Sequence, residues 1–288
     1  MGQAKNYGVS VRDRLKELMA PNLSYQQIIV RYMHERLLYR LSVSRFCDNF
    51  YLKGGALLFA YQRFMARPTI DIDFLGDRIS RDKETIFNVM TEILSIPMEE
   101  DGVTFDVGPG DIIINDIILD KEYNGVRVVF TGHLDTIVQR LSMDIGFGDI
   151  IIPKPVKLSY VPLLDGMDEF DVNAYSLETV VAEKFQTMID KSTANSRMKD
   201  FYDVYTILSG GNIDSFSLGI AVHEVMNNRG THYESGHPLF TDAFKADPKR
   251  LIQWNAFLRK TKITNGPSFD EVMTLVEQKL KPYWEAIQ

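Results

Sequence analysis

The residues with the clearest chemical potential are two aspartates, Asp71 and Asp73, separated by one isoleucine. Residues 70–75 have the apolar character of a buried strand, and side chains alternate between the two faces of a strand. Both carboxylates therefore share one face, while Ile70, Ile72 and Phe74 share the other and can pack into a core. Adjacent carboxylates repel each other unless a cation lies between them, and Mg²⁺ prefers such oxygen ligands. An isolated Asp-x-Asp also fits a solvated strand edge.

A third acid strengthens the metal hypothesis. Residues 138–145 alternate like a strand, with Asp144 on the face opposite to Leu141, Met143 and Ile145. Carboxylates that converge from two strands form the ligand set of a two-metal site for phosphoryl or nucleotidyl transfer. Upstream, Gly54-Gly55 stands between a strand at 50–52 and a helix at 56–64. Backbone amides at such a turn can hold a phosphate, although glycine pairs are also common in plain turns.

The surrounding elements predict a mixed sheet followed by helices. A capping box at residues 24–27 begins a helix that extends to about residue 44. A second helix is expected at 81–94, and strands at 103–107, 111–119 and 125–131, with a turn at Asn124-Gly125. The pattern is helical from residue 176, after a connector at 153–168. We expect an α+β protein with a core at 1–170 and a helical domain at 171–288.

Composition limits the classes of protein. The chain has 288 residues, 45% of them hydrophobic and 25% charged, as in a globular protein. A net charge of −7 argues against a broadly basic nucleic-acid-binding surface. Cys47 is the single cysteine, so no intrachain disulfide can form, which fits a cytoplasmic protein. No apolar run is long enough to span a bilayer, and no targeting segment is evident.

Taken in order, these motifs resemble the AbiEii/AbiGii toxin family of nucleotidyltransferases, within the DNA polymerase β-like superfamily. The resemblance covers roughly residues 10–210. It is carried by segments 32–41, 52–58, 67–74, 144–149, 183–185 and 197–203. It implies a polymerase β-like nucleotidyltransferase core before the helical domain. One departure is that many superfamily members have Gly-Ser where this chain has Gly54-Gly55.

The resemblance also implies roles for individual residues. Asp71 and Asp73 would be the metal-binding pair and Asp144 the third acid, with Mg²⁺ or Mn²⁺ as cofactor. Either Asp200 or Asp203 would match the last acidic motif. The residues expected to contact the NTP substrate are Gly54, Gly55, Lys184 and Arg197.

Several residues of the second half also have structural explanations. Lys184 falls on the apolar stripe of a helix, where it could contact a triphosphate or simply snorkel to solvent. Arg197, Asp200 and Asp203 have the spacing of helical ion pairs, so the two acids could merely orient Lys184 or Arg197. Segment 245–262 is basic and carries Trp254. It could bind RNA or be a solvated helix face.

The leading hypothesis is an Mg²⁺-dependent nucleotidyltransferase toxin of a bacterial toxin–antitoxin or phage-defence pair. It would transfer a nucleotide from an NTP to an acceptor, with tRNA as a candidate, and a cognate antitoxin would be encoded nearby. One alternative is nucleotidyl or phosphoryl transfer to a protein or a small molecule. Another is a binding module with a degenerate catalytic core.

Overall fold

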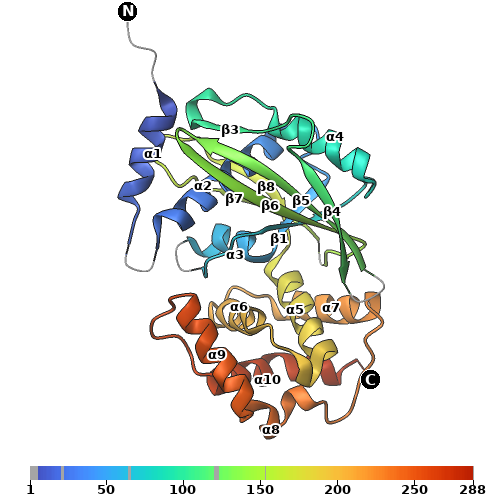
Figure 1. Cartoon of the computed structure of the whole chain (residues 1–288). Coiled ribbons are helices and arrows are strands. Elements are labelled where there is room, and N and C mark those ends of the chain that lie inside the picture. The colour runs from blue at the N-terminus through green and yellow to red at the C-terminus, as the bar shows by residue number, and fades with distance from the viewer. Residues whose placement is uncertain (1–5, 21–22, 64–65, 120–122, 153, 288) are drawn as a thin grey trace, which may run out of the picture. The chain divides into compact units, whose positions relative to one another are not determined.

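The computed structural model describes residues 6–20, 23–63, 66–119, 123–152 and 154–287. The chain divides into two compact units (Figure 1). The first contains residues 1–148 and 156–174, and the second contains 149–155 and 175–288. The chain therefore leaves the first unit at residue 149, returns to it at 156 and leaves again at 175.

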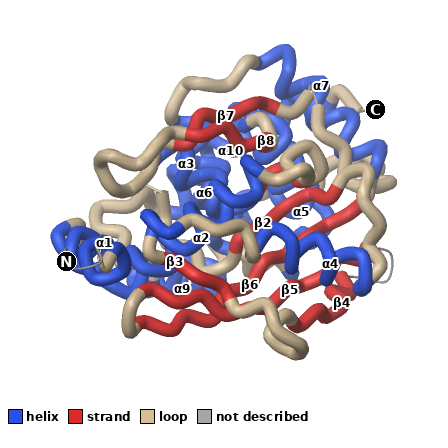
Figure 2. Tube along the Cα trace, turned by 90° about the horizontal axis from the view of Figure 1, so that it is seen from above, coloured by secondary structure: helices blue, strands red, loops and turns tan. Residues whose placement is uncertain are grey.

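The described residues of the first unit form a mixed eight-stranded sheet, whose strands lie side by side in Figure 2. Its order is β3-β5-β6-β2-β1-β8-β7, with β4 paired to β5. Two pairs are parallel, β2 with β6 and β1 with β8. The strands are β1 (Phe50–Lys53), β2 (Ile72–Gly76), β3 (Val103–Phe105), β4 (Ile113–Leu119), β5 (Tyr123–Leu134), β6 (Ile137–Phe147), β7 (Val156–Tyr160) and β8 (Phe170–Ala174).

The central strands bury one face of the sheet. Ile72 and Phe74 of β2 lie opposite Met143 and Ile145 of β6, and all four are at most 1% exposed. The helices of this unit are α1 (Tyr7–Glu17), α2 (Tyr25–Val43), α3 (Gly54–Gln62) and α4 (Lys83–Leu94). A Cβ added at Gly132 of β5 would lie 3.3 Å from Met33 Sδ, so α2 packs closely on this face. Alternation of apolar residues thus gives a core on one face and leaves the other polar.

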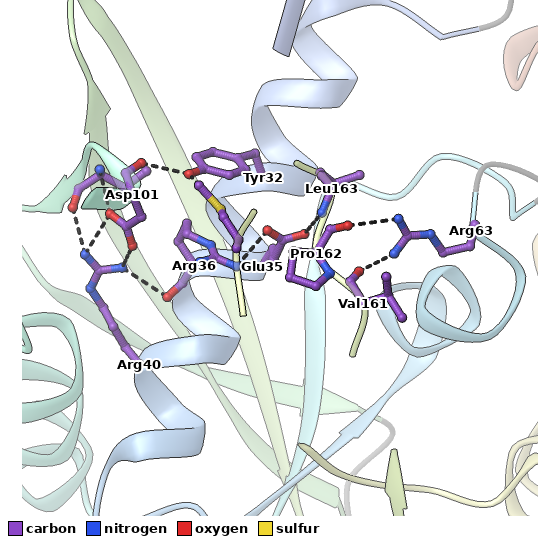
Figure 3. Close-up of polar contacts among 11 residues, drawn as sticks. Tyr32, Glu35, Arg36, Arg40, Arg63, Asp101, Val161, Pro162 and Leu163 are labelled. Atoms are coloured by element: carbon purple, nitrogen blue, oxygen red, sulfur yellow. Dashed lines mark hydrogen bonds and ion pairs between the residues drawn. The ribbon is translucent and has the colours of Figure 1, made fainter. Parts of the chain in front are cut away.

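Helix α2 carries charged side chains into that core (Figure 3). Arg40 forms an ion pair with Asp101, 2.7 Å between Nη1 and Oδ2, and donates to the carbonyls of Ile96 and Val103. Glu35 accepts from Arg36 and from the backbone N–H of Leu163, each at 2.7 Å. These side chains are stable in a core because their hydrogen bonds replace water.

The described part of the second unit is helical, with α5 (Leu177–Lys191), α6 (Met198–Ser209), α7 (Ser215–Asn228), α8 (Asp242–Lys245), α9 (Pro248–Lys260) and α10 (Phe269–Glu285). Aromatic rings form much of its core. Phe201, Trp254 and Phe269 are each at most 1% exposed, and the Phe269 ring lies 5.5–5.6 Å from the other two. Among the described helices of the whole chain, none has the length and apolarity needed to cross a membrane.

Two side chains of segment 245–262 that were considered for RNA binding, Trp254 and Arg250, are buried in the second unit. Trp254 is 1% exposed and donates its indole N–H to the carbonyl of Pro267, so it cannot stack on a base. Arg250 is 3% exposed, donates to the carbonyls of Thr193 and Asn195, and lies over the Phe244 ring. Both side chains stabilise the unit, because helix α9 turns them inward.

Several other expectations were wrong. The connector expected at 153–168 contains strand β7, which pairs with β8. Asn124 and Gly125 lie within β5 and pair with Ile118 and Ile117, so they are not the hairpin turn. The described α3 begins at Gly54, not at residue 56, and the expected end at Phe64 lies outside the described residues. Isolated turn signals misled here because sheet pairing overrides them.

Candidate active site on the polar face of the sheet

A row of charged residues crosses the polar face of the sheet. In the register, Lys53 of β1 lies opposite Asp73 of β2, Asp73 opposite Asp144 of β6, and Asp144 opposite Arg127 of β5. Directly paired residues on neighbouring strands project to the same face. The row therefore places two carboxylates side by side in the middle of the sheet and one cation at each end.

Arg127 engages the carboxylate of Asp144 through two hydrogen bonds. Nε donates to Oδ1 and Nη2 donates to Oδ2, each at 2.7 Å. The side chains are 45% and 22% exposed, respectively. The hydrogen bonds and charge of Asp144, with a smaller contribution from Asp71 and Asp73, raise the pKa of Arg127 above its ordinary value. Arg127 therefore lies in the field of all three acids.

Asp71 precedes β2, and its carboxylate Oδ1 accepts a hydrogen bond of 2.6 Å from Ser142 Oγ. Ser142 lies two residues before Asp144 on β6 and on the same face, so Asp71 flanks the row by one step along the strand direction. The strand begins at Ile72 and not at residue 70 as expected. Ile70 is 72% exposed, so the expectation that it packs into the core was wrong.

Gly54 and Gly55, at the start of helix α3, lie next to this row of charged residues. Gly54 has φ +68°, a left-handed conformation that favours glycine, and an added Cβ would lie 2.1 Å from Asp73 Oδ2. At Gly55 an added Cβ would lie 2.9 Å from Thr69 Cβ and 3.0 Å from its Oγ1. The departure from Gly-Ser at position 55 has a steric reason, because Thr69 already occupies the space of a side chain there.

The donor set fits Mg²⁺ held by few protein ligands. Within the described residues, no three His, Cys, Asp or Glu side chains gather closely enough to enclose a metal ion. Asp73 and Asp144 lie opposite each other in the strand register, whereas the Asp71 carboxylate accepts a hydrogen bond from Ser142. Mg²⁺ commonly takes one or two carboxylates and completes its shell with substrate phosphates and water. Two adjacent carboxylates beside a side-chain-free glycine satisfy that requirement.

The second unit gathers the other expected residues into a buried ionic cluster. Lys184 Nζ of α5 lies 2.6 Å from Asp200 Oδ1 and 2.9 Å from Asp203 Oδ2, both on α6. Arg197 Nε lies 2.5 Å from Asp200 Oδ2. Both aspartates are 1% exposed. Burial alone would raise the pKa of Asp200, but the charges of Lys184 and Arg197 outweigh it and lower that pKa. The predicted helical pairing of Arg197 is confirmed.

Sequence reasoning missed Arg127, Lys53 and Ser142 as partners of the acids. The signal for Arg127 was a charged residue at an alternating position between Val126 and Val128. Its partner could not be read from the sequence, because register across β5 and β6 depends on the whole hairpin.

A mixed sheet with paired carboxylates next to a glycine turn is consistent with a nucleotidyltransferase. A family model described as "Nucleotidyl transferase AbiEii toxin, Type IV TA system" matches residues 36–275. The chain belongs to this AbiEii nucleotidyltransferase family, and the resemblance noted from its motifs is confirmed. It is a nucleotidyltransferase with a mixed α+β fold.

Solved structures are similar to the chain over most of its length. The crystal structure of JHP933 from Helicobacter pylori has 13% identity and a TM-score of 0.51, covering 92% of this chain and 94% of that one. A protein from H. pylori, provisionally named a nucleotidyltransferase, has 14% identity and a TM-score of 0.48, covering 92% and 97%. The first likeness supports the fold alone. No curated protein matches the sequence.

Proposed function

We propose that this nucleotidyltransferase transfers a nucleotide from an NTP to RNA in a Mg²⁺-dependent reaction, as the toxin of a toxin–antitoxin pair. The observation that carries the proposal is the register of Asp73 with Asp144 beside Gly54. The first unit would be the polymerase β-like core, and the second its helical domain. tRNA is the proposed acceptor, and a neighbouring gene would encode the antitoxin. The reaction would take place in the cytoplasm and could serve in phage defence.

The chain's own residues would bind and orient the NTP. Asp73 and Asp144, with Asp71, would hold the metal ion. When bound, Mg²⁺ would neutralise charge on the polyphosphate and act as a Lewis acid. Gly54 and Gly55 begin α3, and their backbone N–H groups would hold a phosphate there with the help of the helix dipole. The acceptor hydroxyl would attack the α-phosphorus, forming a new P–O bond as the bond to pyrophosphate breaks.

The roles of the second unit remain predictions. Lys184 and Arg197 were expected to contact the nucleotide, and Asp200 or Asp203 to be catalytic. Their ion pairs support a role in which the two aspartates fix the position of Lys184. A positioned lysine can bind phosphate as a point charge.

Label transfer tests the reaction directly. Wild type, Asp73→Asn and Asp77→Asn are incubated with Mg²⁺, total RNA and each NTP, labelled at the α or the γ phosphate. Asp77 is a matched control because it directly follows β2 and is paired with Arg78 at the surface. We expect α-label on tRNA-sized RNA with wild type and Asp77→Asn, and none with Asp73→Asn. Transfer of γ-label would instead indicate phosphoryl transfer, and label on protein would indicate another acceptor. Absence of any transfer by wild type would contradict the proposal.

A further inference from the structure

Arg127 forms an ion pair with Asp144, one of the carboxylates that would bind the metal ion in the proposed function. Its guanidinium donates one hydrogen bond to each carboxylate oxygen of Asp144, both at 2.7 Å. A divalent cation at the same oxygens would lie next to this positive charge, and like charges at such distances repel strongly outside bulk water. Arg127 and a metal ion therefore compete for the carboxylate oxygens of Asp144.

The four charges of the row cancel one another, and Asp71 beside the row adds one further negative charge. Asp73 and Asp144 lie between Lys53 and Arg127 in the register, so two negative charges are flanked by two positive ones. The guanidinium of Arg127 reduces the repulsion between the neighbouring carboxylates before any metal ion binds. A metal ion that enters the centre of the row adds two positive charges and removes the need for Arg127 at Asp144.

The side chain of Arg127 can move away from Asp144. Its side chain is 45% exposed, whereas that of Asp144 is 22% exposed. Because the guanidinium is partly exposed, water can replace its hydrogen bonds when the pair opens. The guanidinium fork binds phosphate in the same two-point geometry as carboxylate. A polyphosphate bound at the metal therefore offers Arg127 an equivalent partner close by.

We propose that Arg127 is a resident counter-ion of Asp144 that metal–nucleotide binding displaces, and that the freed guanidinium then holds the polyphosphate. Arg127 is thus a positioning residue in the empty protein and a substrate-binding residue in the loaded one. This inference rests on the proposed function, since it requires a metal ion at Asp73 and Asp144. It predicts that removal of Arg127 has opposite effects on the metal ion alone and on the metal–polyphosphate complex.

The first measurement is binding of Mn²⁺ alone, followed by electron paramagnetic resonance of the free ion. We expect Arg127→Gln to bind Mn²⁺ about three- to tenfold more tightly than wild type, because the competing cation is gone. Arg140→Gln is the control, since Arg140 lies exposed on the same face of β6, four residues from Asp144. Its Mn²⁺ affinity should match that of wild type.

The second measurement is calorimetric titration with preformed Mn²⁺–tripolyphosphate, which needs no knowledge of the preferred base. Arg127→Gln should bind this complex about tenfold more weakly than wild type, because a charge-assisted hydrogen-bond donor is lost. Arg127→Lys should recover part of the affinity, since its point charge lacks the two-point fork. Arg140→Gln should again behave as wild type.

The outcomes separate this inference from the proposed function. Weaker or unchanged Mn²⁺ binding by Arg127→Gln would overturn the displacement, as would unchanged binding of Mn²⁺–tripolyphosphate. Both results leave the proposed function intact if Asp73→Asn still abolishes Mn²⁺ binding. If wild type and Asp73→Asn bind Mn²⁺ equally, the proposed metal site itself fails, and the inference fails with it.

Discussion

Helix α2 and the polar face of the sheet both carry arginine–carboxylate pairs with 2.7 Å contacts, but in different environments. The side chains of Arg40 and Asp101 are 2% and 5% exposed, whereas those of Arg127 and Asp144 are 45% and 22% exposed. Arg40 also donates to three backbone carbonyls, and Asp101 accepts from the N–H of Val103. The buried pair is fixed by its surroundings. The guanidinium of Arg127 donates its hydrogen bonds to Asp144, so this exposed pair can exchange partners.

The difference shows that short ion pairs do not by themselves distinguish scaffold from site. A buried charge must keep all its partners, since losing one leaves an uncompensated charge away from water. A partly exposed pair can open, because water replaces the lost contacts. The α2 network therefore has the character of a stabilising scaffold, and the row on the sheet is free enough to serve the proposed function.

The largest expected effect is on stability, from breaking the buried pair. Arg40→Met should lower the free energy of unfolding by about 3–5 kcal/mol, because Asp101 is left buried and unpaired. The control is Arg45→Met, whose ion pair with Glu92 is exposed at 72% and 44%. That change should cost less than about 1 kcal/mol. Urea unfolding measures both, and equal losses would show that burial does not distinguish these pairs.

Glu35 gives the α2 network a dependence on pH. Burial raises the pKa of Glu35 to about 7, even though Arg36 and the Leu163 N–H favour its charged form. A raised folded pKa contributes stability below the unfolded value near 4.5, and that contribution is lost as pH rises through about 7.

Relative to Glu35→Gln, wild type should therefore lose about 3 kcal/mol of unfolding free energy between pH 4.5 and 8. Urea unfolding at several pH values in that range checks this. A constant difference between the two proteins across the range would show that the carboxylate is already ionised in the folded core.

The Lys184 cluster shares features with both kinds of ion pair. It is buried like the α2 network, but its residues were expected to be functional. The lowered pKa of Asp200 means that its charge stabilises the fold above the unfolded value near 3.8, and this contribution is lost as pH falls below that value. Asp200→Asn should cost about 3 kcal/mol at pH 7, since Lys184 keeps its contact with Asp203, and the deficit should shrink below about pH 4. A deficit that is the same at pH 7 and pH 3 would rule out this ionic contribution.

A substitution at Gly54 changes the shape of the polar sheet face without changing its charge. Gly54→Ala should lose about 1–2 kcal/mol from its positive φ, and Gly211→Ala should lose as much, since Gly211 has φ +71° with no atom within 4 Å of the added Cβ. Only Gly54→Ala pushes against Asp73, so it alone should reduce nucleotide transfer, by about a hundredfold. Equal activity of the two variants would show that the position of Asp73 is not critical.

The sequence predicted which carboxylates share a face of the sheet, but not which residues surround them. Asp73 and Asp144 could be placed on one face because side chains alternate along strands, and the register confirms that placement. Arg127 and Ser142 could not be assigned as their partners, since cross-strand register is a property of the folded sheet. Trp254 and Arg250 were misjudged because composition gives the charge of a segment but not which side of its helix is buried. Strand β7 was missed because its pairing with β8 is what makes it a strand.

The most direct test of the division between scaffold and site compares Asp73→Asn with Asp101→Asn. Each protein is measured for transfer of α-label from NTP to RNA and for its midpoint of urea unfolding, with transfer assayed where wild type is fully folded. We predict that Asp73→Asn loses transfer by at least about a thousandfold with an unchanged midpoint, because it removes a metal ligand. Asp101→Asn should lower the midpoint, and its folded fraction should retain transfer. Full activity of Asp73→Asn would contradict the account.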